Sequence, residues 1–201
     1  FSIDTITESS KREKRLLNGI LALLKKYDKI TDEVSFTKAI LDFIYEVDQF
    51  KIAHFYELKN NILIPTKIWS YENKNDYIDF ITITESTNFK KGIGLPGTAW
   101  KAGKPSYYQD VFESGNFPRA QGKTREELKI CGGLAFPIFF GGEFYGVAEF
   151  FSDEELYYND QYLGFYSSLI DIFINLYLSN KISKSISALS ASIIIIFDQE
   201  D

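Results

Sequence analysis

The sequence predicts an α+β fold with a central antiparallel sheet. Three observations lead to this class. Strand-like segments come in pairs joined by short turns, helical patterns lie before and after these pairs, and 45% of the 201 residues are hydrophobic. A doubly wound parallel sheet needs strands and helices in alternation, and the chain lacks that order. We expect one main domain, because domains usually contain about 100–200 residues.

Two amphipathic helices are expected at the start. The first spans 9–28, and the second follows the segment 28–33. Apolar residues recur at helical spacing in both. They are Leu16, Leu17, Ile20, Leu21 and Leu24 in the first helix, and Phe36, Ile40, Phe43, Ile44 and Val47 in the second. The apolar face of the first helix is larger than one small domain needs to cover its core. This predicts a homodimer through the terminal helices.

Two hairpins and two helices complete the prediction. The segments 51–58 and 62–72 form the first hairpin, and Pro65 makes its second strand an edge or bulged strand. A short helix over 96–104, a strand over 105–111 and a polar excursion follow. The strands 132–140 and 143–152 form the second hairpin. The last helix starts near Asn159 as N-cap and is expected to turn five residues inward. These are Phe165, Leu169, Ile172, Phe173 and Leu176.

Composition narrows the function and the compartment. The net charge is −6 with scattered Lys and Arg, which argues against nucleic acid as a partner. The single cysteine, Cys131, cannot form an internal disulfide and suits the cytoplasm. The apolar runs are shorter than a membrane span, so we expect no membrane contact and no signal peptide. Because the chain contains no Met, we expect an internal piece, whose segment 191–201 predicts the first strand of a following domain.

Gly92, Gly94 and Gly97 lie in "KKGIGLPGTAW" at the G-x-G-x-x-G spacing of a dinucleotide-binding turn. A true fingerprint follows a buried strand. Here the alternating residues 81–84 run into a polar loop, so no apolar strand leads into Gly92. This favours a different use of the glycines.

The ordered segments "GIGLPGTAWKAGKPSYYQDV", "NFPRA" and "GGLAFPIFFGGEFYGVAEFFS", closed by an amphipathic helix, resemble the GAF domain family over residues 31–178. The resemblance implies a sheet of about six antiparallel strands, with helices on one side and a loop-covered ligand pocket on the other. It also implies a sensory module in a bacterial-type multidomain signalling protein. Residues 1–30 would be a dimerisation or signalling helix, and 179–201 would continue the last helix toward the next domain.

The resemblance also suggests a set of ligand-binding residues. They are Trp69, Ser70, Leu95, Pro96, Gly97, Thr98, Asp110, Phe117, Arg119, Thr124, Cys131, Gly133 and Glu149. The glycine turn either contacts a phosphate at the start of its helix or serves the backbone alone. Trp69 either stacks on a purine or is ordinary core, and Thr124 either adds a hydroxyl or is exposed.

Two charged residues are the most informative candidates. Arg119 either meets a phosphate or carboxylate of a ligand or forms a salt bridge with Asp110. Strand alternation places Glu149 in an apolar strand, on the same face as Val147 and Phe151. It either reads a ligand, as the matching glutamate does in relatives that bind cyclic GMP, or pairs with a lysine or arginine.

The function implied is a non-catalytic sensor of a small molecule. A cyclic purine nucleotide is the leading ligand, with cyclic AMP slightly favoured over cyclic GMP, and an attached cyclase or histidine kinase is the regulated enzyme. The alternative is a ligand-free GAF module that holds a dimer together. We expect no cofactor, metal or catalytic residue: His54 suits an ordinary sheet histidine, Cys131 does not suit a bilin, and the reductases built on this fold need several cysteines. Residues 112–128 are expected to form a mobile lid.

Overall fold

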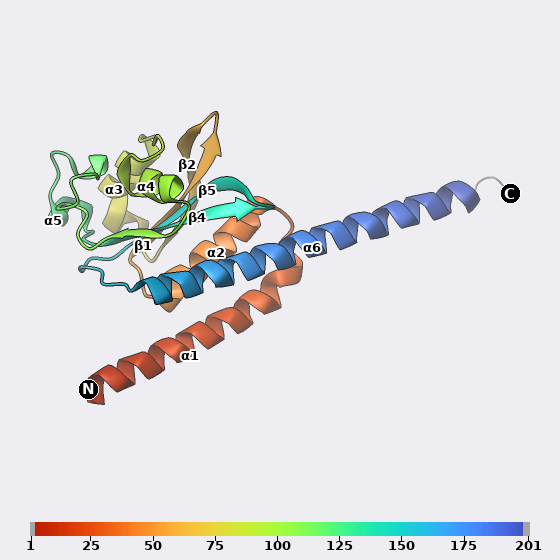
Figure 1. Cartoon of the computed structure of the whole chain (residues 1–201), viewed down its shortest axis with the longest axis horizontal. Coiled ribbons are helices and arrows are strands. Elements are labelled where there is room, and N and C mark those ends of the chain that lie inside the picture. Colours follow the sequence, from red (N-terminus) through yellow and green to blue (C-terminus); the bar gives the residue numbers. More distant parts are fainter. Residues whose placement is uncertain (1–2, 199–201) are drawn as a thin grey trace.

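A five-stranded antiparallel sheet forms the centre of the computed structural model, which describes residues 3–198 (Figure 1). The strands are β1 (Ile52–Lys59), β2 (Ile62–Tyr71), β3 (Ser106–Tyr108), β4 (Gly133–Phe140) and β5 (Glu143–Phe151), in the order β2-β1-β5-β4-β3. This confirms the α+β class and the five strands that the sequence pattern predicts between residues 51 and 152. A sixth strand, which the resemblance implies, does not occur in the described range. Pro65 lies in the edge strand β2, where it pairs with Tyr56 and borders the bulge that β2 forms between Pro65 and Trp69, as expected.

Helices lie on both faces of the sheet. They are α1 (Ile3–Lys26), α2 (Glu33–Val47), α3 (Ile78–Glu85), α4 (Gly94–Ala102), α5 (Arg125–Leu128) and α6 (Asp160–Asp198), with short 3-10 turns at Tyr27–Lys29, Lys74–Tyr77 and Pro118–Ala120. One apolar cluster joins α2 and α6 to one face of the sheet, and a second joins α3, α4 and residues 111–130 to the other. Residues 112–128 are called the lid below. The second face of the sheet, where the resemblance implies a pocket, is therefore covered by helices and by the lid.

The first cluster confirms the expected face of α2. All five predicted residues of this helix are buried. In α6 the start is confirmed, because Asn159 Oδ1 accepts a hydrogen bond from the Tyr162 N–H at 2.8 Å. Its inward face is partly wrong: Phe165, Ile172 and Leu176 are 41–55% exposed. The buried residues are Leu163, Tyr166, Ile170, Phe173, Ile174 and Tyr177. Apolar residues occur all round this helix, so their spacing does not select one face.

Two segments with a strand-like residue pattern form helix, and in the second of them this contradicts a prediction. The alternating Ile81 to Thr84 forms the helix α3, with Phe80, Ile81 and Thr84 buried. The segment 192–198 continues α6, so the predicted strand there is wrong. A strand needs a neighbouring strand for its N–H and C=O groups, whereas a continuing helix satisfies them within the segment. Residues 199–201 lie outside the described range, and a following domain stays a prediction.

A buried carboxylate holds α1 against the domain. Asp48, the C-cap of α2, accepts hydrogen bonds from Arg12 Nε at 3.0 Å, Tyr162 Oη at 3.0 Å and Tyr158 Oη at 3.1 Å. The guanidinium of Arg12 also lies 3.7 Å from the centre of the Tyr162 ring. These contacts join the N-terminal helix, α2 and the start of α6, and Figure 1 shows α6 continuing well past the sheet.

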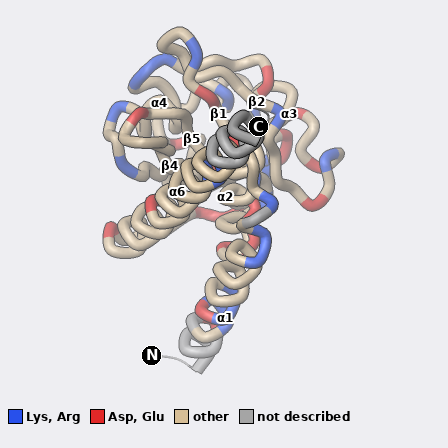
Figure 2. The backbone as a smooth tube through the Cα atoms, turned by 90° about the vertical axis from the view of Figure 1, so that its right-hand side faces the viewer, with Lys and Arg blue, Asp and Glu red and all other residues tan. Residues whose placement is uncertain are grey.

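Charge and apolar surface are distributed unevenly over the molecule. Acidic and basic residues are intermixed on the domain, whereas α6 is largely uncharged along its visible length (Figure 2). Leu17, Leu21 and Leu24 form an exposed apolar stripe on α1, while Leu16 and Ile20 pack against the first cluster. None of the helices in the described range is long and apolar enough to cross a bilayer.

Candidate ligand-binding site

Glu149 lies at the centre of the second apolar cluster. It is on β5, the middle strand of the sheet, on the face that it shares with Val147 and Phe151. Its cross-strand neighbour on β1 is His54. The Glu149 side chain has no exposed surface. A buried carboxylate is costly unless it is paired and hydrogen-bonded, so its partner determines what this face of the sheet can do.

The partner of Glu149 is Arg119 from the lid. Nη1 of Arg119 lies 2.5 Å from Glu149 Oε1, and Nη2 lies 2.7 Å from Oε2, so the two groups form a bidentate pair. Nη1 also donates to Thr84 Oγ1 of α3 at 3.1 Å. Of the roles that the sequence leaves open for Glu149, pairing with a basic residue is therefore present. The salt bridge with Asp110, one of the two alternatives for Arg119, is not present: Asp110 instead accepts a hydrogen bond from Arg125.

Aromatic rings surround the guanidinium of Arg119. Its Cζ lies between 4.6 and 5.8 Å from five ring centres, which belong to Tyr56, Phe80, Phe89, Phe117 and Phe151. A cation within about 6 Å of a ring face is attracted by the negative electrostatic potential of that face, most strongly where water is excluded. The space therefore has a carboxylate on its floor and aromatic walls, and Arg119 fills it.

The only histidine of the chain borders this pair. His54 is fully buried, and its Nε2 lies 3.0 Å from the carbonyl oxygen of Thr66, which makes Nε2 the protonated nitrogen. Nδ1 lies 3.6 Å from Glu149 Oε1 and has no hydrogen-bond partner within the described residues. Burial lowers the pKa of His54, and this effect exceeds the opposing attraction of the Glu149 carboxylate. His54 is therefore a neutral imidazole with an unpaired acceptor.

Glu149 is the charged member of the group. Burial by itself raises the pKa of its carboxyl, but the positive charge and hydrogen bonds of Arg119, together with His54, outweigh burial. The pKa of Glu149 is thus lowered from its ordinary value, and the group is an ionised carboxylate that accepts hydrogen bonds.

The lid also occupies the start of α4. Asn116 Oδ1 accepts from the Gly94 N–H at 2.9 Å, and Asn116 Nδ2 donates to Thr98 Oγ1 at 3.2 Å. The Gly92 N–H is taken by the Gly97 carbonyl at 2.7 Å. A Cβ at Gly97 would lie 2.4 Å from the Lys90 carbonyl oxygen, so this position needs glycine for close backbone packing.

The predicted residues divide into two groups. Trp69, Phe117, Arg119 and Glu149 lie in the second cluster, and Leu95, Pro96, Gly97, Thr98 and Gly133 form its α4 and β4 boundary. Trp69 packs its ring 4.2 Å from the His54 ring and donates to Glu85. The remaining predicted residues lie outside this cluster and form the second group.

The residues of the second group have separate structural partners. Ser70 donates to Asp42 Oδ1 of α2 at 2.5 Å, on the opposite face of the sheet from Trp69. Thr124 is exposed and forms the capping box of α5 with Glu127. Cys131 is buried, which raises the pKa of its thiol, and Asp110 also accepts from the Phe112 N–H. The sequence did not indicate Thr84 or Asn116, because both act through contacts with segments far along the chain.

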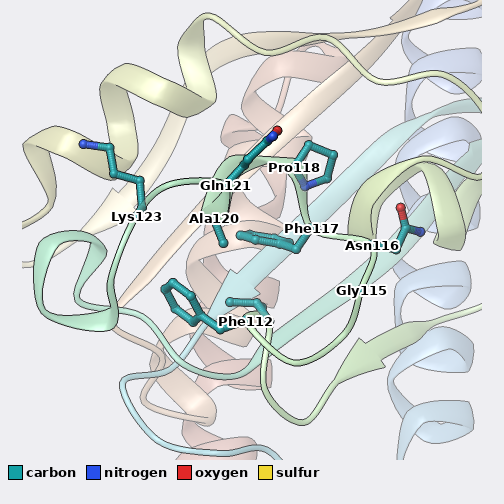
Figure 3. A pocket seen from close by; sticks show the side chains of 9 residues that line it. Phe112, Gly115, Asn116, Phe117, Pro118, Ala120, Gln121 and Lys123 are labelled. Carbon is teal, nitrogen blue, oxygen red and sulfur yellow. The ribbon is translucent and has the colours of Figure 1, made fainter.

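A cavity of about 530 Å³ lies in the lid itself (Figure 3). Phe112, Asn116, Phe117 and Lys123 are among its lining residues. Arg119 does not line it, because its side chain is fully buried against Glu149. The open space therefore belongs to the lid, and the space beside the sheet is filled by the lid's own arginine.

Comparison with known proteins identifies the family. The GAF domain profile matches residues 31–172, more than half of the chain, so the chain belongs to the GAF domain family. No curated protein sequence matches it significantly.

Solved structures with the same fold have little sequence identity to this chain. The GAF domain of an Acinetobacter phosphoenolpyruvate-protein phosphotransferase superposes with a TM-score of 0.59 at 9% identity, over 85% of this chain and 97% of that one. The A. aeolicus nlh2 GAF domain in an inactive state gives 0.58 at 20% identity, over 85% and 99%. The free methionine-R-sulfoxide reductase of Neisseria meningitidis gives 0.55 at 14% identity, over 80% and 89%. At these identities the likeness concerns the fold.

The Arg119–Glu149 pair yields a stability prediction. Glu149→Gln should lower the free energy of unfolding by about 3–5 kcal/mol, because it leaves the Arg119 charge buried without its counter-ion. Arg119→Met combined with Glu149→Leu removes both charges and should lie within about 2 kcal/mol of wild type. Urea unfolding followed by circular dichroism measures both. Asp153→Asn, in an exposed ion pair with Lys51, is the control and should cost less than about 1 kcal/mol. A stable Glu149→Gln protein would contradict this account.

The neutral state of His54 yields a pH prediction. Its pKa is lowered in the folded protein, so below the ordinary value of 6.5 the unfolded chain binds a proton that the folded protein does not. The free energy of unfolding should fall as pH decreases below about 6.5, by up to about 1.4 kcal/mol per pH unit. Thermal unfolding between pH 5 and 8 measures this slope. His54→Asn should flatten it, and an unchanged slope in that variant would assign the effect to other groups.

Proposed function

We propose that this chain is a non-catalytic GAF sensor domain in which a small molecule binds between the sheet and the lid by separating Arg119 from Glu149. The observation that carries this proposal is the pair itself: a buried anion and a buried cation, one on the rigid sheet and one on a surface segment. A ligand with an acidic group and a row of N–H donors complements both at once. Binding would then change the position of the lid by as much as the ligand prefers the open state.

A cyclic purine nucleotide has this combination of groups. Its phosphate is a bidentate partner for the Arg119 guanidinium, and N–H groups on the purine edge are partners for the Glu149 carboxylate. Trp69, beside His54, offers a ring for stacking. Because Glu149 is ionised, it accepts rather than donates. This favours the guanine edge over the adenine edge, so the slight preference for cyclic AMP inferred from sequence turns toward cyclic GMP in our proposal.

The nucleotide proposal is tested by thermal unfolding of the full chain with cyclic AMP, cyclic GMP and their linear monophosphates. A ligand at about 100 times its dissociation constant should add about 2.7 kcal/mol to the free energy of unfolding. Trp69→Phe should weaken the effect, and Ser70→Ala, on the opposite face of the sheet, should not. If no nucleotide shifts the melting temperature of the wild-type protein, a cyclic nucleotide is not the ligand.

The proposed output runs through the terminal helices to an attached enzyme such as a cyclase or histidine kinase. Two contacts support this route: Arg12 of α1 lies over Tyr162 of α6, and both side chains meet at Asp48. The α6 helix continues far beyond its last contacts with the first apolar cluster, around Tyr177 and Leu178. A shift of α6 at the domain would therefore be carried along a single helix.

The proposal includes no reaction and places the domain in the cytoplasm. Some structural neighbours are reductases, as the Neisseria protein shows by its name. Chemistry through an internal disulfide needs two thiols, and this chain has one, which is buried and has a raised pKa. A single unpaired thiol also suits a reducing compartment.

A ligand-free dimerisation module is the second candidate. Two observations favour it: Arg119 fills the space beside the sheet, and apolar residues are exposed on both terminal helices. They are Leu17, Leu21 and Leu24 on α1 and Phe165, Ile172, Leu176, Ile182 and Ile186 on α6. Exposed apolar residues at helical spacing are typical of a helix that pairs with a symmetry mate.

We expect the wild-type chain to be a homodimer at micromolar concentration and Leu17→Glu with Leu21→Glu to be a monomer. The charged side chains would have to be buried in the interface, which is costly. Light scattering gives the mass. Asn18→Glu with Lys25→Glu, on the flank of the same helix, should remain dimeric. A monomeric wild-type protein would remove the dimer from both candidate functions.

A further inference from the structure

We propose that Arg119 is an internal ligand: it occupies a receptor site for a planar cation with a fork of N–H donors, and small molecules with such a fork bind by displacing it. The site is formed by the Glu149 carboxylate, the Thr84 hydroxyl and five aromatic rings. This inference rests on the proposed function in one respect, that the same space receives the signal molecule.

The residues around Arg119 form a site that fits a guanidinium group and not a cation of any shape. Both carboxylate oxygens of Glu149 are used by the two terminal nitrogens of Arg119, at 2.5 and 2.7 Å. An ammonium group is a point charge and cannot form this parallel pair of bonds. The rings of Phe117 and Phe80, with centres 4.6 and 5.1 Å from the guanidinium carbon, add a surface on which a flat cation packs.

Apart from Phe117, which lies in the lid, the residues that form the site are held independently of Arg119. Glu149 lies on the central strand and Tyr56 on its neighbour, and the Tyr56 hydroxyl donates to the Thr84 carbonyl of α3 at 3.1 Å. Phe89 is joined to Leu63 by two backbone hydrogen bonds of 2.9 and 3.0 Å. The sheet and α3 therefore provide the receptor side of the contact, and the lid provides the occupant.

The internal occupant leaves part of the site unsatisfied. Arg119 Nε and His54 Nδ1 are buried and have no hydrogen-bond partner within the described residues. Since Nε2 of His54 donates to Thr66, Nδ1 is an acceptor that Arg119 does not reach. A free ligand with the same fork and one more N–H group can satisfy Nδ1 as well as Glu149. Unpaired buried polar atoms are costly, so this difference favours exchange.

Asn116 is the second residue of the lid whose side chain makes polar contacts outside the lid. Its Oδ1 accepts a hydrogen bond from the Gly94 N–H at the start of the nine-residue α4, and its Nδ2 donates to the Gly92 carbonyl at 3.2 Å. Pro118 lies between the two anchors, Asn116 and Arg119, and Gly115 and Gly122 lie just outside them. A cavity opens beside this segment. Displacing Arg119 therefore releases a segment that has few other buried polar contacts with the sheet.

The experiment removes the internal ligand and supplies a soluble one. In Arg119→Ala, N-ethylguanidinium chloride at about 100 times its dissociation constant should raise the melting temperature by roughly 5–10 °C. Ethylammonium chloride at the same ionic strength carries the charge without the fork, and it should have no more effect than on wild type. In the wild-type protein the tethered arginine competes at a high effective concentration, so the same probe should produce little shift.

Matched variants locate the effect. Arg119→Ala with Glu149→Gln removes the carboxylate and should not respond to the probe. Arg125→Ala removes the other lid arginine, whose side chain is 46% exposed, and should not respond either. Equal shifts with the two cations, or an equal shift in the double variant, would overturn the internal-ligand assignment. If Arg119→Ala alone does not fold, the probe should restore its far-ultraviolet circular dichroism, and failure to do so would also overturn the assignment.

The two proposals fail separately. A response to N-ethylguanidinium without any response of the wild-type protein to cyclic nucleotides would support the internal ligand and remove the nucleotide as the signal. A nucleotide response without rescue of Arg119→Ala would do the reverse.

Discussion

The guanidinium of Arg119 and the carboxylate of Glu149 are removed from water together, and the structure on one side of the sheet depends on this. Each charge alone would be very costly at that depth, so neither residue can occupy its position without the other. The pair joins the middle strand β5 to a segment about thirty residues earlier in the chain, and Thr84 adds α3 to the same contact. The ion pair and the buried Phe117 and Leu128 together hold the lid against the sheet and α3.

This constraint gives physical content to the idea of a sensor. A pocket that is simply empty changes little when a ligand enters, whereas a pocket filled by the protein's own side chain must exchange one occupant for another. The exchange would free Asn116 and Arg119 together, because both lie on the same short segment. The likeness to the A. aeolicus domain and to the Acinetobacter domain concerns the fold and does not identify a ligand.

The opposite face of the sheet packs against the terminal helices. There the buried Asp48 accepts hydrogen bonds from Arg12, Tyr158 and Tyr162, and these bonds hold α1 beside the start of α6. The two buried acids lie on different layers of the domain: Glu149 faces the lid and Asp48 faces the terminal helices. The strands of the sheet lie between the two layers.

The sequence by itself determined the five strands of the sheet, the hairpin turns and the family. Alternating apolar residues, Pro65 and the Gly141–Gly142 turn are local signals, because strand geometry and turn conformation depend on neighbouring residues. It also indicated that Glu149 either reads a ligand or pairs with a lysine or arginine. Tertiary structure decided which: the arginine that pairs with Glu149 lies thirty residues away, and Asp110, closer in sequence to Arg119, takes Arg125 instead. It likewise decided the inward face of α6 and the helical state of Ile78–Glu85 and of 192–198, because packing and hydrogen-bond partners, rather than spacing, select among conformations that the local pattern allows.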